Sequence, residues 1–182
     1  MWVSIIIYLM LFVQFLLLCL FLLIMYLLVR GIFGVPFVRS NKVFSRAMME
    51  LAQVKPGEVV VDYGSGDGAI VNVAAKEFGA KGIGFEYLRA LVLYARARAL
   101  LAGVSKNVEF RRENFLSGKT LPKADVVSSY LFPEVNAKLE PLLIRDYPSG
   151  TRVVSRTFLF QTLPMIASKK VGKETVYLYQ IP

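Results

Sequence analysis

The stretch VVVDYGSGDGAIV, residues 59–71, carries the strongest structural signal in this chain of 182 residues. Three valines run into Asp62, and three of the next six residues are glycine. A short apolar run is typical of a buried strand, and a glycine-rich loop lets a ligand come close to the backbone. We therefore predict a strand at about 58–62, a loop at 64–68 and a helix from about 68 to 78.

Beyond this loop the chain alternates between strand-like and helix-like segments. Further strands are predicted at KGIGFEY, NVEFRREN, ADVVSSYLF, TRVVSRTF and, isolated at the end, TVYLYQI. Helices are predicted at YLRALVLYARARALLAG and EVNAKLEPLLIRDY. Strands separated by helices indicate right-handed crossovers and a parallel sheet covered on both faces. Ligands of such a sheet bind at the carboxyl ends of its strands, which is where the glycine loop lies.

Residues 1–29 form an apolar segment without a charged side chain. Roughly 20 apolar residues cross a bilayer as a helix, so this segment is long enough for a transmembrane anchor. A cleaved signal peptide would have a basic start, a shorter apolar region and a small-residue cleavage site, and a buried core helix is the other alternative. We predict an anchor at residues 1–29, a juxtamembrane linker at residues 30–40 and one further domain at residues 41–182.

Positive charges follow this apolar segment at Arg30, Arg39, Lys42 and Arg46, whereas only the terminal amine precedes it. Because positively charged flanks stay on the cytoplasmic side of a membrane, we predict a single-pass membrane protein. Its residues 30–182 are expected in the cytoplasm or an equivalent inner compartment.

The composition narrows the possible chemistry. The chain has no histidine, and its single cysteine, Cys19, lies inside the apolar segment. An intrachain disulfide and a cysteine-based metal site are therefore excluded, the commonest general base is missing, and we expect no metal. The net charge of +9 suits attraction to anionic lipid headgroups. Nucleic acid is not an expected partner, because the basic residues are dispersed and no aromatic-basic platform is evident.

The acids around the glycine loop favour a cationic ligand. Gly64, Gly66 and Gly68 lack the Gly-x-Gly-x-x-Gly spacing of a dinucleotide-binding loop. Asp62 and Asp67 are unfavourable neighbours for a pyrophosphate, but they suit a ligand with an ammonium group and a net positive charge. S-adenosylmethionine is such a ligand.

Two polar residues at later strand ends agree with a nucleoside. Glu86 ends the second strand, where a carboxylate can accept hydrogen bonds from both ribose hydroxyls. Asn114 follows the third strand, where its amide can pair with the adenine edge. For each residue the alternative is a solvated polar side chain at a strand end.

These residues resemble the class I S-adenosylmethionine-dependent methyltransferases, and the likeness extends past the loop. The matching segments are GVPFVRSNKVFSRAMMELAQVKPGEVVVDYGSGDGAIV, GFEY, YLFPEVNAKLEPLL, GTRVVSRTF and TVYLYQI. Together they resemble the small archaeal protein-lysine methyltransferases and the mitochondrial, membrane-anchored lysine methyltransferases that modify the ATP synthase c-subunit and the adenine nucleotide translocase. The resemblance covers essentially all of residues 34–182. It implies an α/β fold with a Rossmann-like, mostly parallel sheet whose last strand is antiparallel, preceded by one transmembrane helix.

The resemblance also implies roles for individual residues. The methionine part of the cofactor is expected to be surrounded by Asp62, Gly64, Ser65, Gly66 and Asp67. Glu86 is expected to hold the ribose, and Asn114 to lie by the adenine. The acceptor nitrogen is expected to approach the methyl group near Tyr130 and Glu134, which are the catalytic candidates.

Three positions depart from the pattern of the family. Tyr63 stands where relatives commonly have leucine, and Ala69 stands where they commonly have arginine. Arg156 stands where the archaeal proteins show a histidine. The first two departures leave cofactor binding intact, whereas the third bears on the choice of acceptor.

A lysine acceptor has to lose a proton from a group whose ordinary pKa is about 10.4. An apolar aromatic channel lowers that pKa by desolvation, and Tyr130, Phe132 and Phe37 are candidates to form one. Glu134 can orient the ammonium group or relay a proton. The alternative is that Glu134 is only an acid favoured by the dipole at a helix N-terminus.

The sequence thus predicts a membrane-anchored, S-adenosylmethionine-dependent protein-lysine N-methyltransferase that acts on membrane or membrane-proximal proteins. The anchor would raise the local concentration of such acceptors. Two alternatives stay open at this point. One is methylation of a lipid headgroup or a lipophilic small molecule, and the other is a non-catalytic membrane module that binds S-adenosylmethionine.

Overall fold

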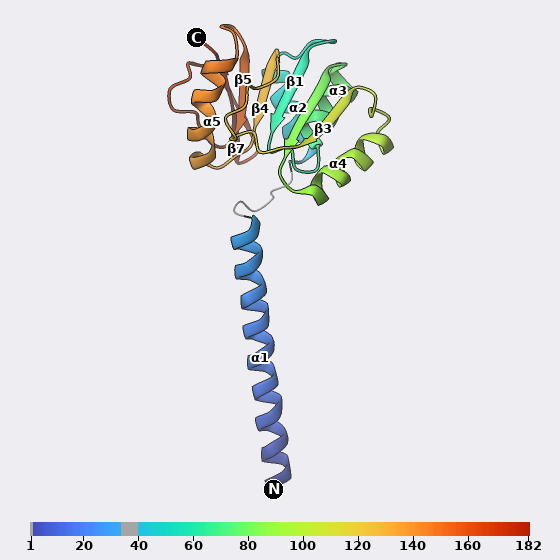
Figure 1. The fold of residues 1–182 in the computed structure, drawn as a ribbon, viewed down its shortest axis with the longest axis vertical. Helices are drawn as coiled ribbons and strands as arrows, with labels where there is room; N and C mark the ends of the chain where they lie inside the picture. Colours follow the sequence, from blue (N-terminus) through green and yellow to red (C-terminus); the bar gives the residue numbers. More distant parts are fainter. Residues whose placement is uncertain (1, 34–39) are drawn as a thin grey trace. The chain divides into compact units, whose positions relative to one another are not determined.

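The computed structural model describes residues 2–33 and 40–182, with the backbone alone at residue 3 and residues 27–33. Contacts divide the chain into two units, Met1–Phe37 and Val38–Pro182 (Figure 1). The first unit contains one helix, α1 (Trp2–Phe33), which extends four residues past the predicted end of the anchor. Its segment Ser4–Tyr26 is long and apolar enough to cross a membrane, a property that anchors share with signal sequences.

The second unit is a seven-stranded sheet in the order β3-β2-β1-β4-β5-β7-β6. Its strands are β1 (Val59–Tyr63), β2 (Lys81–Glu86), β3 (Val108–Arg112), β4 (Val126–Ser129), β5 (Arg152–Arg156), β6 (Met165–Val171) and β7 (Glu174–Gln180). Its helices are α2 (Lys42–Leu51), α3 (Ala69–Phe78), α4 (Arg89–Leu101) and α5 (Pro133–Asp146). The first five strands are parallel, and β7 pairs antiparallel with both β5 and β6, which confirms the predicted fold class.

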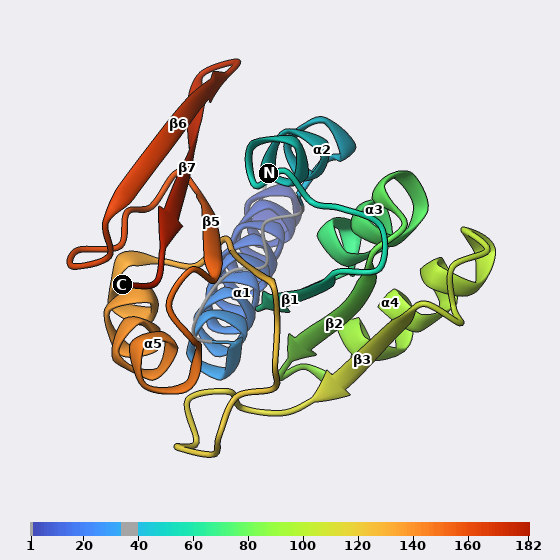
Figure 2. The ribbon, with the colours of Figure 1, turned by 90° about the horizontal axis from the view of Figure 1, so that it is seen from above.

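Helices cover both faces of the sheet (Figure 2). On one face α2, α3 and α4 bury side chains such as Met48, Val73 and Ala95 against the strands. On the other face α5 buries Leu139 and Leu143 among residues of the same strands. The strand core is therefore apolar on both sides, as expected of a parallel sheet.

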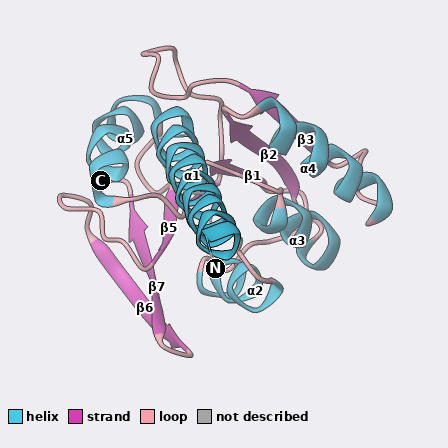
Figure 3. Ribbon diagram, turned by 90° about the horizontal axis from the view of Figure 1, so that it is seen from below, coloured by secondary structure: helices cyan, strands magenta, loops and turns pink. Residues whose placement is uncertain are grey.

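The sequence prediction missed β6, whereas its antiparallel last strand corresponds to β7. The structure pairs β7 with β5 on one side and with β6 on the other, so that a hairpin forms the outer edge of the sheet (Figure 3). The sequence of β6, MIASKKV, lacks the alternation of apolar and polar residues that marks a half-buried strand. The strand is largely exposed in the structure. The sequence signal that was available for this hairpin is Gly172, because glycine favours a tight turn between two strands. In the structure Gly172 lies in that turn, with a positive φ of 61°.

The structure gives Tyr63 a buried partner on the second face of the sheet. Its hydroxyl lies 2.8 Å from the hydroxyl of Tyr147, the residue that follows α5. Burial raises the pKa of both phenols, that of Tyr147 to about 12, so both stay protonated and the pair remains a neutral hydrogen bond. This bond is a physical reason for tyrosine at position 63.

We expect Tyr63→Phe to lower the free energy of unfolding by about 1–3 kcal/mol, because it leaves the buried Tyr147 hydroxyl without a partner. Tyr147→Phe should have a similar effect. The double variant should lose less than the sum of the two, because no buried hydroxyl is then left unpaired. Urea unfolding of the four proteins measures this coupling, and strictly additive losses would show that the hydroxyl pair contributes nothing.

Candidate active site

The glycine loop leaves the carboxyl end of β1 and turns into α3. The backbone N–H groups of Gly64 and Ser65 both donate to the carbonyl oxygen of Phe85, each at 2.9 Å, which holds the loop against β2. Gly64 and Gly68 have φ values of 77° and 74°, which side chains disfavour. A Cβ atom at Gly64 would also lie 2.6 Å from the Leu131 side chain, and one at Gly68 would lie 2.5 Å from Phe110. The packing of the protein itself therefore requires these two glycines.

Asp62 is buried at the base of this loop. Its Oδ1 accepts a hydrogen bond of 2.7 Å from the hydroxyl of Ser128 on the neighbouring strand β4. Burial raises the pKa of Asp62 to about 7, the hydrogen bond from Ser128 opposes the rise, and the charges of Glu86 and Asp67 add to it. A buried carboxylate of this kind is stabilised by a positive charge placed beside it.

Glu86 lies at the end of β2, the strand next to β1. Its Oε2 accepts a hydrogen bond of 3.0 Å from the N–H of Gly66, and its Oε1 accepts one of 2.9 Å from the N–H of Leu88. A carboxylate has about four acceptor positions, so both oxygens can still accept hydrogen bonds from hydroxyl groups. The structure thus brings Asp62, Gly66 and Glu86 together at one edge of the sheet.

The two other polar residues predicted in the loop, Asp67 and Ser65, are both buried. The Asp67 carboxylate is buried and pairs with Arg98 of α4 at 2.6 Å, and its Oδ1 accepts from the N–H of Ala69. The hydroxyl of Ser65 is buried, and it has no hydrogen-bond partner among residues 2–33 and 40–182. It lies 2.7 Å from the position of a Cβ atom on Gly84. The Asp67–Arg98 pair fastens the loop to α4, a role that sequence reasoning missed because 31 residues separate the partners.

Asn114 lies exposed just beyond β3. Its Oδ1 accepts a hydrogen bond of 3.0 Å from the N–H of Leu116, which fixes the turn after the strand. A small cavity of about 110 Å³ opens at the same end of β3, with Phe85, Arg111 and Phe115 among its lining residues. The placement of the adenine near Asn114 stays a prediction.

Aromatic side chains gather at the carboxyl ends of β4 and β5. The ring centroids of Tyr130 and Phe158 are 6.1 Å apart, and those of Phe132 and Phe158 are 5.4 Å apart. Phe158 was not predicted, because it follows β5 in the chain and meets the other two rings only in the folded sheet. Phe37, the third predicted aromatic residue, lies outside the described residues. We call Tyr130, Phe132 and Phe158 the aromatic cluster.

A strained turn holds Phe158 in this cluster. Thr157, just before it, has a φ of 67°, which is rare for a β-branched residue. The turn is secured by a hydrogen bond of 2.7 Å from the hydroxyl of Ser155 to the carbonyl oxygen of Phe158. Backbone strain of this kind concentrates at functional sites, where the surrounding contacts maintain it.

Arg156 fills the space beside the aromatic cluster. Its guanidinium carbon lies 3.7 Å from the centroid of the Phe44 ring and 4.3 Å from that of Tyr130. The carboxylate of Glu174 accepts hydrogen bonds from its Nε and Nη2, at 2.8 and 2.7 Å. Its Nη1 is buried and has no hydrogen-bond partner within the part of the chain that the structure describes. The sequence marked Arg156 only as a departure from the family and gave no sign of these partners.

Glu134 lies in the first turn of α5, which begins with Pro133. Its side chain is exposed and makes no hydrogen bond or ion pair with any other described residue. Both interpretations of Glu134, as a catalytic group and as a helix-start acid, therefore stay predictions. No cluster of three or more potential metal ligands occurs among the described residues, and the expectation of no metal also stays a prediction.

Comparisons with known proteins identify the family of this chain. The model of a family described as the ANTKMT methyltransferase domain matches residues 62–167. A protein-lysine N-methyltransferase from Saccharolobus islandicus is 35% identical over 156 residues, which cover 81% of this chain and 94% of that protein. An adenine nucleotide translocase lysine N-methyltransferase from Mus musculus is 35% identical over 148 residues and is matched over 63% of its length, so the chain spans less than two thirds of that relative.

A solved structure adds a ligand to these comparisons. It is the crystal structure of an RNA methyltransferase from Salinibacter ruber in complex with S-adenosyl-L-homocysteine. Its TM-score is 0.76 and its sequence identity 40%, over 80% of this chain and 94% of that chain. The ligand of that protein is the demethylated form of the cofactor that the acids of the loop predict.

Proposed function

Because the chain belongs to the ANTKMT family of S-adenosylmethionine-dependent methyltransferases, we propose that it methylates lysine side chains of membrane-associated proteins. The bound cofactor supplies an activated methyl group. The observation that carries the proposal is the position of the aromatic cluster, which follows the strands β4 and β5 at the same edge of the sheet as Asp62 and Glu86.

The acids of the site would hold the cofactor. We assign the cationic methionine part to Asp62, whose raised pKa makes a neighbouring positive charge favourable. Glu86 would accept the ribose hydroxyls, and Asn114 would lie by the adenine. The remaining predicted contacts with the methionine part come from Gly64, Ser65, Gly66 and Asp67.

The aromatic cluster would receive the acceptor lysine. Its rings exclude water and so favour the neutral amine, which is the nucleophile. The positive charge of Arg156 beside Tyr130 acts in the same direction, although Glu174 offsets part of it. Orientation of the amine by Tyr130, and by Glu134 if the acceptor reaches it, would supply the rest of the rate enhancement.

The helix α1 would be a membrane anchor. The apolar segment Ser4–Tyr26 is long enough to span a bilayer, and basic residues follow it in the sequence. The positive-inside rule then places the catalytic domain in the cytoplasm or an equivalent inner compartment. Attachment would select membrane proteins as acceptors by raising their local concentration.

The test uses membranes from cells that lack the gene, supplemented with three proteins. These are the full chain, a variant without residues 1–29, and a control in which an unrelated apolar helix replaces residues 1–29. With a radiolabelled methyl donor, we expect label on lysines of membrane proteins, identified by mass spectrometry. The truncated variant should give at least about tenfold less label, and the control should restore it. Undiminished labelling of membrane proteins by the truncated variant would contradict the role of the anchor.

The same experiment separates the other acceptor classes. The Salinibacter ruber protein is described as an RNA methyltransferase, and the net charge of +9 is compatible with RNA, which makes RNA a second candidate acceptor. Label that ribonuclease releases would identify RNA, and label that organic solvent extracts would identify a lipid headgroup. Either result would replace protein lysine as the acceptor and leave the methyltransferase activity standing.

A further inference from the structure

The helix α4 has an apolar surface that faces away from the sheet. Its inner face is made of the small buried residues Val92, Ala95 and Ala99. Its outer side carries large apolar side chains that are 54%, 50%, 68% and 88% exposed, namely Leu93, Tyr94, Leu100 and Leu101. We call these four residues the outer row. A contiguous row of this kind on a charged domain marks an interaction surface.

The charged side chains of α4 itself are all positive, and that of Arg98 is paired with Asp67 of the glycine loop. Arg89, Arg96 and Arg98 belong to α4, and the helix sequence RALVLYARARALL contains no acid. A second copy of this chain packed symmetrically on the outer row would place these arginines against their own equivalents. A negatively charged, apolar-cored surface is the better complement, and an anionic bilayer has both properties.

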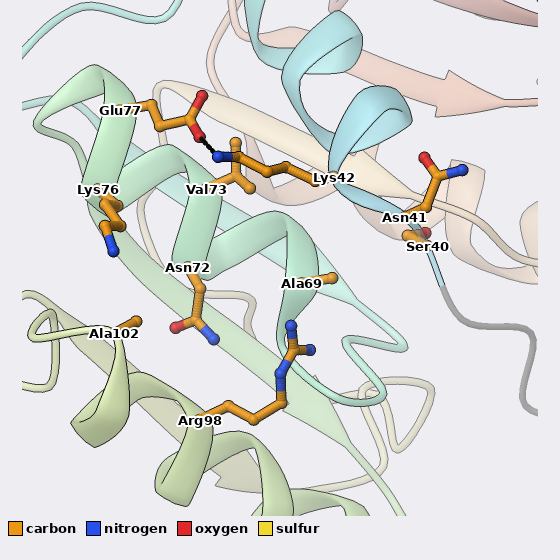
Figure 4. A pocket seen from close by; sticks show the side chains of 10 residues that line it. All are labelled: Ser40, Asn41, Lys42, Ala69, Asn72, Val73, Lys76, Glu77, Arg98 and Ala102. Atoms are coloured by element: carbon orange, nitrogen blue, oxygen red, sulfur yellow. Dashed lines mark ion pairs between the residues drawn. The ribbon is translucent and has the colours of Figure 1, made fainter.

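The outer row also lies near the point where the chain enters the domain. A cavity of about 400 Å³ is lined by Ser40 and Lys42 at the start of α2, by Asn72 and Lys76 of α3, and by Arg98 and Ala102 at the end of α4. Figure 4 shows Arg98 reaching from α4 toward α3, while Asn72 points from α3 toward α4. Among the described residues, the lining of this cavity contains the cations Lys42, Lys76 and Arg98 and the acid Glu77. Lys42 pairs with Glu77 at 2.9 Å and Arg98 pairs with Asp67 at 2.6 Å, so Lys76 is the cation that the cavity offers to an outside anion.

The connection between α1 and this cavity is short. Seven residues lead from Phe33 at the end of α1 to Ser40, and they reach at most about 25 Å when fully extended. If α1 is anchored in a bilayer, Ser40 therefore lies within about 25 Å of the end of α1. Arg98 of α4 lines the same cavity as Ser40, so the tether is short enough for α4 to reach the membrane surface.

We propose that the outer row of α4 docks on an anionic bilayer, with lipid phosphates received by Arg89 and Arg96 of α4 and by Lys76 of the neighbouring cavity. The inference rests on the proposed membrane anchor. Tyr94 and the leucines enter the interfacial region, and the arginines of α4 stay among the headgroups. Since α4 begins three residues after Glu86, docking through Leu93 and Tyr94 in its N-terminal half would hold the Glu86 end of β2 near the membrane surface. Acceptor lysines next to the bilayer would thereby be favoured.

The test places nitroxide labels on the full chain in vesicles of phosphatidylcholine, with and without phosphatidylglycerol. One protein carries the label on native Cys19, in α1. In a Cys19→Ser background, a second carries it at Leu101→Cys in the outer row, and a third at Ser149→Cys, an exposed control site outside α4. With phosphatidylglycerol present, we expect the ratio of collision rates with oxygen and with a water-soluble nickel complex to rise severalfold at position 101 and to stay unchanged at position 149. Adding Leu93→Glu should return position 101 to the aqueous value.

The outcomes distinguish the inference from the proposed anchor. A label on Cys19 that reports the bilayer interior, together with an aqueous value at position 101, would overturn the docking and leave the anchor standing. An aqueous value on Cys19 would overturn the anchor and the docking with it. Equal shielding at position 101 in vesicles without phosphatidylglycerol would overturn the role of the cations. Spin–spin broadening between labels at position 101 would assign the outer row to a second copy of the chain instead.

Discussion

Replacing Asp62 by asparagine is expected to weaken S-adenosylmethionine binding about a hundredfold or more at pH 8. The variant keeps the size of the side chain and an oxygen that can accept from Ser128, so only the negative charge is lost. Removing one partner of a buried pair of opposite charges typically changes the binding free energy by about 2–5 kcal/mol. Titration calorimetry measures the affinity.

The affinity of the natural protein should also depend on pH through Asp62. Its pKa is about 7 in the free protein, so the carboxylate is protonated at lower pH. Binding should weaken about tenfold per pH unit below 7, if only the ionised form binds the cation. Above about 8 it should weaken again, because an ordinary α-amino group loses its proton there. The Asp62→Asn variant should lack the lower limb of this profile.

The same variant should be more stable than the natural protein in the absence of cofactor. The pKa of Asp62 in the folded protein lies above its ordinary value of 3.8, so the stabilising contribution of the protonated form is complete below pH 3.8 and is lost as the pH rises through about 7. At pH 8 the buried charge costs at most about 4 kcal/mol, and asparagine removes this cost. Urea unfolding of the natural protein and of Asp62→Asn at pH 5 and pH 8 tests whether the stability advantage of the variant increases with pH.

Asp125→Asn is the matched control for this substitution. The Asp125 carboxylate accepts a hydrogen bond of 2.8 Å from the N–H of Val59, at the opposite edge of the sheet. The Asp125→Asn substitution should leave both the affinity for S-adenosylmethionine and the pH dependence of that affinity unchanged. If Asp62→Asn bound the cofactor as tightly as Asp125→Asn does, with the same profile, Asp62 would not be the partner of the cation.

Glu174→Gln is expected to lower the free energy of unfolding by about 3 kcal/mol. Arg156 would then keep its charge in a buried position without a carboxylate partner, and breaking a buried pair typically costs about 3–5 kcal/mol. We expect a loss at the low end of this range because the Glu174 side chain is 33% exposed. Water can therefore partly replace the lost carboxylate as the partner of Arg156. Contacts with the rings of Phe44 and Tyr130 would retain some stabilisation of the cation.

The chain offers a control with the same chemistry at the surface. Arg111 and Glu109 form a bidentate pair at 2.8 Å, and both side chains are exposed. Glu109→Gln should change the free energy of unfolding by about 1 kcal/mol or less. The double variant Arg156→Met/Glu174→Leu should recover most of the stability lost by Glu174→Gln, since it leaves no buried charge.

Urea unfolding of these variants in detergent micelles measures the losses. Methylation assays should show slower turnover in Glu174→Gln with little change in cofactor affinity, because Arg156 contacts Tyr130 in the aromatic cluster. Equal losses for Glu174→Gln and Glu109→Gln would show that Arg156 does not depend on its carboxylate.

Local sequence patterns are sufficient to predict the edge of the sheet at which Asp62 and Glu86 lie. Three valines, an acid and a glycine loop indicate a buried strand and its turn, and Glu86 marks the end of the next strand. Because parallel strands bring their carboxyl ends to one edge, these neighbouring motifs already place Asp62 beside Glu86. The apolar run that became α1 is readable from composition in the same way.

The contacts around the aromatic cluster and the ion pair of Asp67 could not be predicted from local sequence patterns. Phe158, the pairing of Arg156 with Glu174, and the ion pair of Asp67 with Arg98 join residues that are 18 to 31 positions apart or lie on separate strands. The strand β6 is recognisable only by its pairing with β7, since its own residues lack alternation. Periodicity reports which face of an element is apolar, but it does not report which distant element meets that face. Those contacts arise only when the sheet assembles, and they determine which charges in this protein are buried.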